Sequence, residues 1–89
     1  MAKKRRKLNK DFERKIYTSR KNVELVLAKI YDIDDEDIQK EYISAFNKVV
    51  NLYDELKEDY DQQGFSDNSE ELLTSYKNAF YLFESEFEI

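Results

Sequence analysis

Apolar side chains recur at intervals of three and four along three segments of the chain, the spacing of one face of an α-helix. The first stripe is interrupted at Thr18-Ser19, so the sequence leaves open whether this helix is broken there. The three stripes consist of Phe12, Ile16, Ser19, Val23, Val26, Leu27 and Ile30; of Ile38, Tyr42, Ala45, Phe46, Val49, Leu52, Tyr53, Leu56 and Tyr60; and of Leu72, Leu73, Tyr76, Ala79, Phe80, Phe83 and Phe87. The pattern predicts three helices.

The ends of these helices carry recognisable signals. Asp34 is a good N-cap for the second helix, and Asn68 with Glu71 three residues later resembles a capping box for the third. The only glycine, Gly64, follows the second stripe, where a helix C-terminus favours a left-handed residue. Because the connections are short, we predict an all-α fold, an antiparallel three-helix bundle over residues 9–89 with a flexible, disordered basic arm over residues 1–8.

The composition excludes most catalytic chemistry. Among 89 residues there is no Cys, His, Pro or Trp, so thiol catalysis, thiolate metal sites and histidine bases are absent. Asp32, Asp34 and Glu36 loosely resemble the opening of a calcium loop, but Asp37 replaces its glycine and helix capping explains the acidic residues better. We therefore predict a protein that is not an enzyme and has no cofactor and no metal site.

The net charge of −5 hides an uneven distribution. Residues 1–21 hold ten basic against two acidic side chains, and residues 22–89 hold five lysines against eighteen carboxylates. Local charges of +8 and −13 at the two ends of a chain have consequences for association. Part of this asymmetry has a purely structural explanation, because Lys10, Arg14 and Lys15 would lie beside the acidic end of the second helix, residues 54–61.

The basic end supports one functional hypothesis. A run of five basic residues near the N-terminus is typical of phosphate contacts. This alternative makes the chain a nucleic-acid-associated accessory or regulatory protein, with possible contacts from Lys3, Lys4, Arg5, Arg6, Lys7, Lys10 and Arg14.

The acidic end of the chain supports a second functional hypothesis. In the predicted bundle the end of the first helix, the start of the second and the end of the third converge. We call this surface the acidic pole; it consists of Asp32, Asp34, Asp35, Glu36, Asp37, Glu41, Glu84, Glu86 and Glu88. Glu84, Glu86 and Glu88 lie at the negative end of their own helix dipole, where local folding does not favour carboxylates. The acidic pole is therefore the leading candidate for a partner-binding surface.

Four aromatic residues lie off the apolar stripes or in a loop, namely Tyr17, Tyr31, Phe65 and Tyr81. Exposed aromatic side chains beside carboxylates are typical of protein-binding surfaces, so these four are interface candidates.

The leading hypothesis is a small acidic inhibitor or modulator that binds a basic, nucleic-acid-binding protein. In size and charge the chain resembles small phage-encoded anti-defence proteins, including anti-CRISPR proteins and anti-restriction DNA mimics, which implies a host-cell cytoplasmic location. A further alternative is self-association, in which the basic arm of one copy docks on the acidic pole of the next. No apolar run approaches the length of a membrane span, so we expect a cytoplasmic protein without membrane contact.

Overall fold

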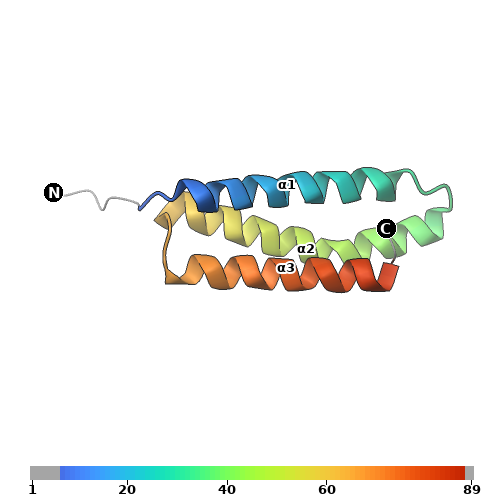
Figure 1. Cartoon of the computed structure of the whole chain (residues 1–89). Coiled ribbons are helices and arrows are strands. Elements are labelled where there is room, and N and C mark those ends of the chain that lie inside the picture. The colour runs from blue at the N-terminus through green and yellow to red at the C-terminus, as the bar shows by residue number, and fades with distance from the viewer. Residues whose placement is uncertain (1–6, 88–89) are drawn as a thin grey trace.

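The protein folds into three α-helices. A computed structural model describes residues 7–87 and places α1 at Lys10–Tyr31, α2 at Glu36–Gln63 and α3 at Asp67–Phe87 (Figure 1). No β-strand forms in this part of the chain; a single isolated bridge joins Lys7 to Gly64. The prediction of an all-α bundle with three helices is confirmed, and no helix in residues 7–87 is both long and apolar enough to cross a membrane.

The first helix is continuous through Thr18-Ser19. Ser19 is buried inside the apolar stripe, where its hydroxyl donates a hydrogen bond of 2.8 Å to the carbonyl of Lys15, four residues earlier. This bond satisfies the hydroxyl within the helix, so a polar residue occupies a core position without interrupting the backbone.

Two of the predicted helix starts are shifted. Asp35, not Asp34, caps α2, because its carboxylate accepts hydrogen bonds from the backbone N–H groups of Asp37 and Ile38. The α3 helix begins before the predicted Asn68 cap. Its first turn is closed by Ser66 and Ser69, with the Ser66 N–H donating to the Ser69 hydroxyl at 3.0 Å. Ser69, at the third position of α3, thus accepts the hydrogen bond from the residue before the helix, the role that the predicted capping box gave to Glu71.

The polar contacts between elements show how the helices lie against one another. The backbone N–H of Asn9, the N-cap of α1, donates to the hydroxyl of Tyr60 near the end of α2. At the other end of α1, the Gln39 side chain donates to the carbonyls of Ile30 and Tyr31. The hydroxyl of Tyr42 near the start of α2 donates to the carbonyl of Phe87 at the end of α3.

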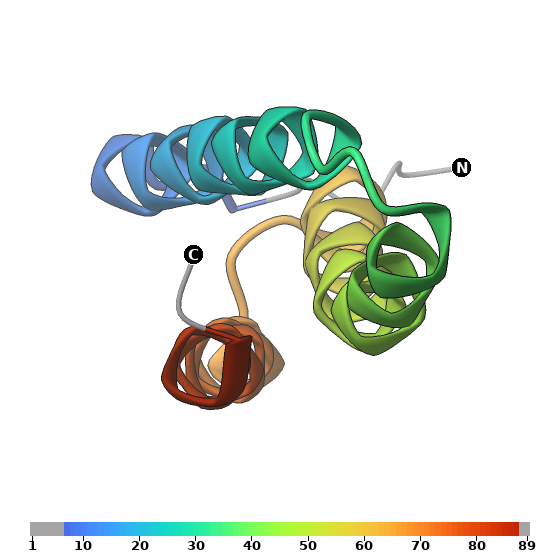
Figure 2. The same ribbon diagram turned by 90° about the vertical axis from the view of Figure 1, so that its right-hand side faces the viewer.

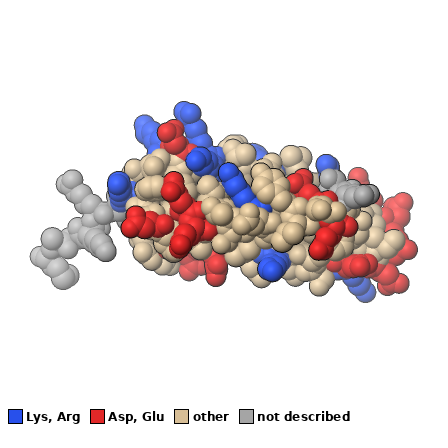
Figure 3. All heavy atoms as spheres, turned by 60° about the horizontal axis from the view of Figure 1, so that its bottom comes forward, with Lys and Arg blue, Asp and Glu red and all other residues tan. Residues whose placement is uncertain are grey.

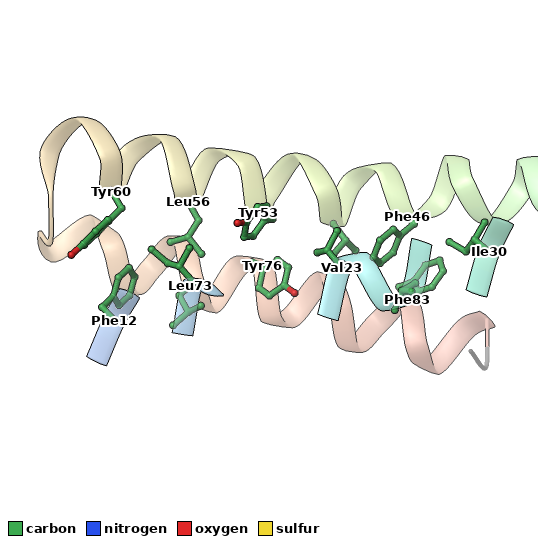
Figure 4. Packing of buried hydrophobic residues seen from close by; sticks show 13 residues of the cluster. Phe12, Val23, Ile30, Phe46, Tyr53, Leu56, Tyr60, Leu73, Tyr76 and Phe83 are labelled. Carbon is green, nitrogen blue, oxygen red and sulfur yellow. The ribbon is translucent and has the colours of Figure 1, made fainter. Parts of the chain in front are cut away.

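The core runs along the length of the molecule, between the inner faces of the three helices (Figure 4). Ile30 of α1 and Phe46 and Leu56 of α2 are fully buried. Phe46 packs on Phe83 of α3 with ring centroids 4.8 Å apart. As the stripes predicted, apolar and aromatic side chains fill this core, and removing such area from water is the main stabilising contribution to the fold.

Lys7 is attached to the connection between α2 and α3. Its carbonyl accepts a hydrogen bond from the N–H of Phe65, and its ammonium lies 6.0 Å from the centre of the Phe65 ring. The other basic residues of the predicted arm, Lys3, Lys4, Arg5 and Arg6, lie outside the described residues.

Candidate interaction surfaces

The acidic pole forms one end of the molecule. Asp32 and Asp34 belong to the connection between α1 and α2, and Glu84 and Glu86 lie in the last turn of α3. The other four described members are Asp35, Glu36, Asp37 and Glu41, from the cap and first turns of α2. All eight are exposed, and acidic side chains gather at the right-hand end of the view in Figure 3. Glu88 lies outside the described residues.

Lys29 and Lys40 are the basic residues nearest this surface in the sequence, and neither forms an ion pair with it in the described part of the chain. Among residues 7–87 the ion pairs are Arg20–Glu24, Lys21–Glu24 and Lys57–Asp61, each within a single helix and none at the acidic pole. The carboxylates of α2 have a local reason for their place, because Asp35, Glu36 and Asp37 meet the positive end of the helix dipole. Glu84 and Glu86 have no such local reason, because they lie at the negative end of the α3 dipole, in a last turn that contains no basic residue.

Two apolar side chains accompany these carboxylates. Tyr31, the last residue of α1, is 64% exposed and is followed directly by Asp32. Ile38 was placed on the core-facing stripe by the sequence pattern, and that prediction is wrong, because its side chain is 44% exposed. Ile38 lies in the first turn of α2, directly after Asp37 of the acidic pole. The acidic pole therefore carries apolar anchors as well as charge.

The four aromatic candidates do not share one surface. Phe65 is half-buried and packs edge-on against Phe12, with ring centroids 5.1 Å apart. Tyr17 is exposed beneath the ammonium of Lys21, which lies 5.3 Å from the centre of the ring. Tyr81 is exposed on α3, three residues before Glu84, and Tyr31 ends α1 directly before Asp32, so these two lie next to carboxylates of the acidic pole.

The basic residues at the start of α1 do not pair with the acidic end of α2. Within residues 7–87 no ion pair joins the two helices, so the expected pairing of Lys10, Arg14 and Lys15 is wrong. The contact is made by Glu13 instead, whose carboxylate accepts a hydrogen bond from the hydroxyl of Tyr60. With Glu13 turned toward α2, the adjacent Arg14 and Lys15 lie on the side of α1 that faces α3.

A groove of about 450 Å³ lies between α1 and α3. Its lining includes the apolar side chains of Val26, Tyr76 and Phe80, with Leu25 and Tyr81 among the residues beside them. Within residues 7–87, its basic members are Arg14, Lys15, Lys29 and Lys77, and Glu84 is its one carboxylate. Sequence reasoning did not identify this groove. The available signal was Leu25, which lies beside Val26 and widens the apolar stripe beyond what one neighbouring helix can cover.

Tyr76 lies against the groove and connects its two walls. Its hydroxyl donates a hydrogen bond of 3.1 Å to the carbonyl of Ser19 on α1. Burial raises the pKa of Tyr76 to about 12, because ionisation would place a charge among apolar neighbours. Burial also raises the pKa of Tyr53. Both tyrosines are neutral at physiological pH; Tyr76 contributes packing and a hydrogen bond, and Tyr53 packs against the Tyr76 ring.

The described residues provide no assembled chemical site. Across residues 7–87, no group of three or more Asp and Glu side chains is placed to hold a metal ion. The acidic pole is a spread of separate, exposed carboxylates, which suits recognition of a charged surface better than coordination of one ion.

No protein-family model matches the chain, and no match is found among curated proteins or among solved structures.

Proposed function

We propose that this chain is a non-enzymatic interaction protein that binds a basic surface of a protein partner through its acidic pole. The observation that carries the proposal is the set of eight exposed carboxylates without an ion pair in the described part of the chain, two of them at the unfavourable end of α3. Folding alone gives no reason for Glu84 and Glu86, so a partner surface is the simplest explanation of their position.

The surface has both properties that a specific interface requires. Its charge steers a basic partner toward it and disfavours acidic ones, since uncompensated charges of one sign accelerate encounter and select the complementary surface. Tyr31 and Ile38 supply apolar area for the centre of the contact, where desolvation provides most of the affinity.

The partner class that fits best is a nucleic-acid-binding protein. Such proteins carry dense Lys and Arg surfaces that neutralise phosphates, and a cluster of carboxylates can occupy the same surface. Covering that surface would make the chain an inhibitor or modulator, of the phage anti-defence, anti-CRISPR or DNA-mimic type. The proposal includes the antiparallel order of the helices and treats residues 1–8 as a basic arm that this contact does not need.

The test compares matched baits in affinity purification from the source cell, followed by mass spectrometry. The acidic-pole variant carries Asp34→Lys, Glu84→Lys and Glu86→Lys and leaves the Asp35 cap intact. The control carries three equal reversals at exposed carboxylates elsewhere, Asp54→Lys, Glu55→Lys and Glu71→Lys. A third bait lacks residues 1–6.

We expect the wild-type, control and truncated baits to retain one basic, nucleic-acid-binding protein and the acidic-pole variant to lose it. Retention of that protein by the acidic-pole variant, or its equal loss from the control, would overturn the proposal.

The nucleic-acid-associated alternative has one specific observation in its favour, because Lys10, Arg14 and Lys15 have no ion pair within residues 7–87. Fluorescence anisotropy with a labelled oligonucleotide tests it. Binding at low salt that is lost without residues 1–6 would support this alternative, and the absence of binding would exclude it.

A further inference from the structure

The groove between α1 and α3 occupies the place of a missing fourth helix. The α2 helix contacts both neighbours, whereas α1 and α3 diverge on the side away from it, as the end-on view in Figure 2 shows. Bundles of four helices close this side with another helix that packs its apolar stripe between the two walls. Here the space is a groove of about 450 Å³ with Val26, Tyr76 and Phe80 in its lining.

The charge of the groove is opposite to that of the chain. Among the described residues, four of its lining side chains are cationic and one is a carboxylate, in a protein with a net charge of −5. None of the four cations, Arg14, Lys15, Lys29 and Lys77, forms an ion pair within residues 7–87. A ligand that fits this lining must therefore be acidic.

Apolar side chains in the same groove define the ligand further. Leu25 on α1 is 61% exposed and Tyr81 on α3 is 63% exposed, and both line the groove. From Arg14 to Lys29 the α1 wall is roughly 22 Å long at 1.5 Å per residue, which is about four helical turns. A helix of that length with apolar residues three and four positions apart would place one stripe against Val26 and Phe80 and carboxylates against both basic edges.

We propose that this groove binds an acidic amphipathic helix of a partner protein. Among the described residues the site shares only Glu84 with the acidic pole, and it takes a ligand of the opposite charge, so the proposal goes beyond the function proposed above. A second copy of this chain is a poor occupant, because the apolar residues of its own acidic helices, such as Leu56 and Phe83, are buried in its core. Nucleic acid is the competing occupant, since a base can stack on the exposed Tyr81, but the aliphatic side chains of Leu25 and Val26 fit an apolar helix stripe better than a base.

The test uses a fluorescein-labelled synthetic peptide of about 18 residues, roughly five helical turns. Leu residues occupy one face at intervals of three and four, Glu residues flank that face, and Ala and Gln fill the rest. The control peptide has the same composition with the Leu positions shuffled. Binding to the full chain is measured by fluorescence anisotropy at physiological salt, where purely electrostatic association is weakened.

The protein variants come in matched pairs. Leu25→Asp and Lys77→Glu alter exposed residues of the groove. Leu82→Asp and Lys48→Glu make the same changes at exposed residues outside it. Because all four side chains are exposed, circular dichroism should show the same helical content in each variant.

We expect the patterned peptide to bind at least about tenfold more tightly than the shuffled one, the effect of about 1.4 kcal/mol. Leu25→Asp and Lys77→Glu should each weaken binding by at least about fivefold, whereas Leu82→Asp and Lys48→Glu should leave it unchanged. Absence of saturable binding, equal binding of the shuffled peptide, or equal effects of both members of a pair would overturn the proposal.

Two other outcomes would also overturn it by assigning the groove to a different occupant. One is that a labelled single-stranded oligonucleotide displaces the patterned peptide and no longer binds the Lys77→Glu variant. The other is a dimer of the chain, seen in sedimentation, that dissociates in Leu25→Asp but not in Leu82→Asp.

Discussion

The hydroxyl of Tyr76 on α3 donates a hydrogen bond of 3.1 Å to the backbone carbonyl of Ser19 on α1, 57 residues earlier in the chain. Ser19 is itself buried, and its hydroxyl donates a hydrogen bond to the backbone carbonyl of Lys15 within α1. This contact joins the two helices that diverge on either side of the groove, so it limits how far they separate.

Removal of this hydrogen bond should destabilise the fold without changing its core. The substitution Tyr76→Phe keeps the ring, which packs near Tyr53 and Phe80, and deletes only the hydroxyl. We expect a loss of about 1 kcal/mol in the free energy of unfolding, the usual net value of one intramolecular hydrogen bond. Urea denaturation measures it, with Tyr81→Phe as the control, because the Tyr81 side chain is exposed.

The raised pKa of Tyr76 makes stability depend on pH in the alkaline range. An unfolded tyrosine ionises near pH 10, whereas Tyr76 in the folded chain holds its proton until about pH 12. Tyr76 therefore adds no pH dependence below pH 10, and the folded state loses stability as the pH rises from 10 to 12, on the order of 2 kcal/mol at the upper end.

Denaturation at several pH values in this interval checks the slope. Wild type should lose more stability than Tyr76→Phe across the interval, because lysines and other tyrosines titrate in both proteins. Equal slopes for the two proteins would show that Tyr76 ionises as freely in the folded as in the unfolded chain.

The periodicity of apolar residues was sufficient to predict three helices and most of the core. Phe46, Leu56 and Phe83 lie on the predicted stripes and are buried, because burial of one face is what the helical period encodes. Ser19 shows what the pattern cannot resolve. A polar residue within a stripe can mark a break or a satisfied core position, and only the hydrogen bonds to Lys15 and Tyr76 distinguish the two.

The acidic pole was predictable to a greater extent than the groove. Charge and position relative to a helix end are local properties of the sequence, so Glu84 and Glu86 could be singled out directly. The groove depends on the angle between α1 and α3, which side-chain packing against α2 determines. Lys29 and Lys77 are 48 residues apart in the sequence, and nothing in their local sequence indicates that they line one surface.

Tyr60 fixes the start of α1 against the end of α2. Its hydroxyl accepts a hydrogen bond from the Asn9 N–H at 3.0 Å and donates one to the carboxylate of Glu13. The substitution Tyr60→Phe leaves both groups without this partner, so we expect a loss of about 1–3 kcal/mol in the free energy of unfolding. Calorimetry measures the change. Tyr17→Phe, at an exposed position, should leave the melting temperature unchanged.

The turn between α2 and α3 requires glycine. Gly64 has φ 75° and ψ −161°, a conformation that a Cβ atom disfavours, and it is buried beside Lys7. We expect Gly64→Ala to cost about 1–3 kcal/mol in the free energy of unfolding. The adjacent substitution Gln63→Ala, at an exposed helical position, should change stability by less than about 0.5 kcal/mol in the same urea titration. An equal loss in both variants would contradict the steric explanation.

The last turn of α3 provides a test of whether its carboxylates serve folding or binding. Glu84→Gln and Glu86→Gln remove negative charge from the negative end of the helix dipole, and no basic residue lies in that turn. We expect each substitution to increase the free energy of unfolding by about 0.3–1 kcal/mol at low ionic strength. Glu70→Gln is the matched control, because Glu70 lies in the first turn of the same helix, where removal of the charge should destabilise by a similar amount.

Urea denaturation at low and at high salt measures both effects, and both should shrink at high salt because the interaction with the dipole is screened. If Glu84→Gln and Glu86→Gln instead lower stability, then these carboxylates have a role in folding, and their position gives no support to a partner surface at the acidic pole. If they stabilise the fold and weaken retention of the basic partner in the affinity purification, the chain keeps two residues that are unfavourable for its own stability. A surface residue that lowers the stability of the fold in this way is typical of a residue retained for binding.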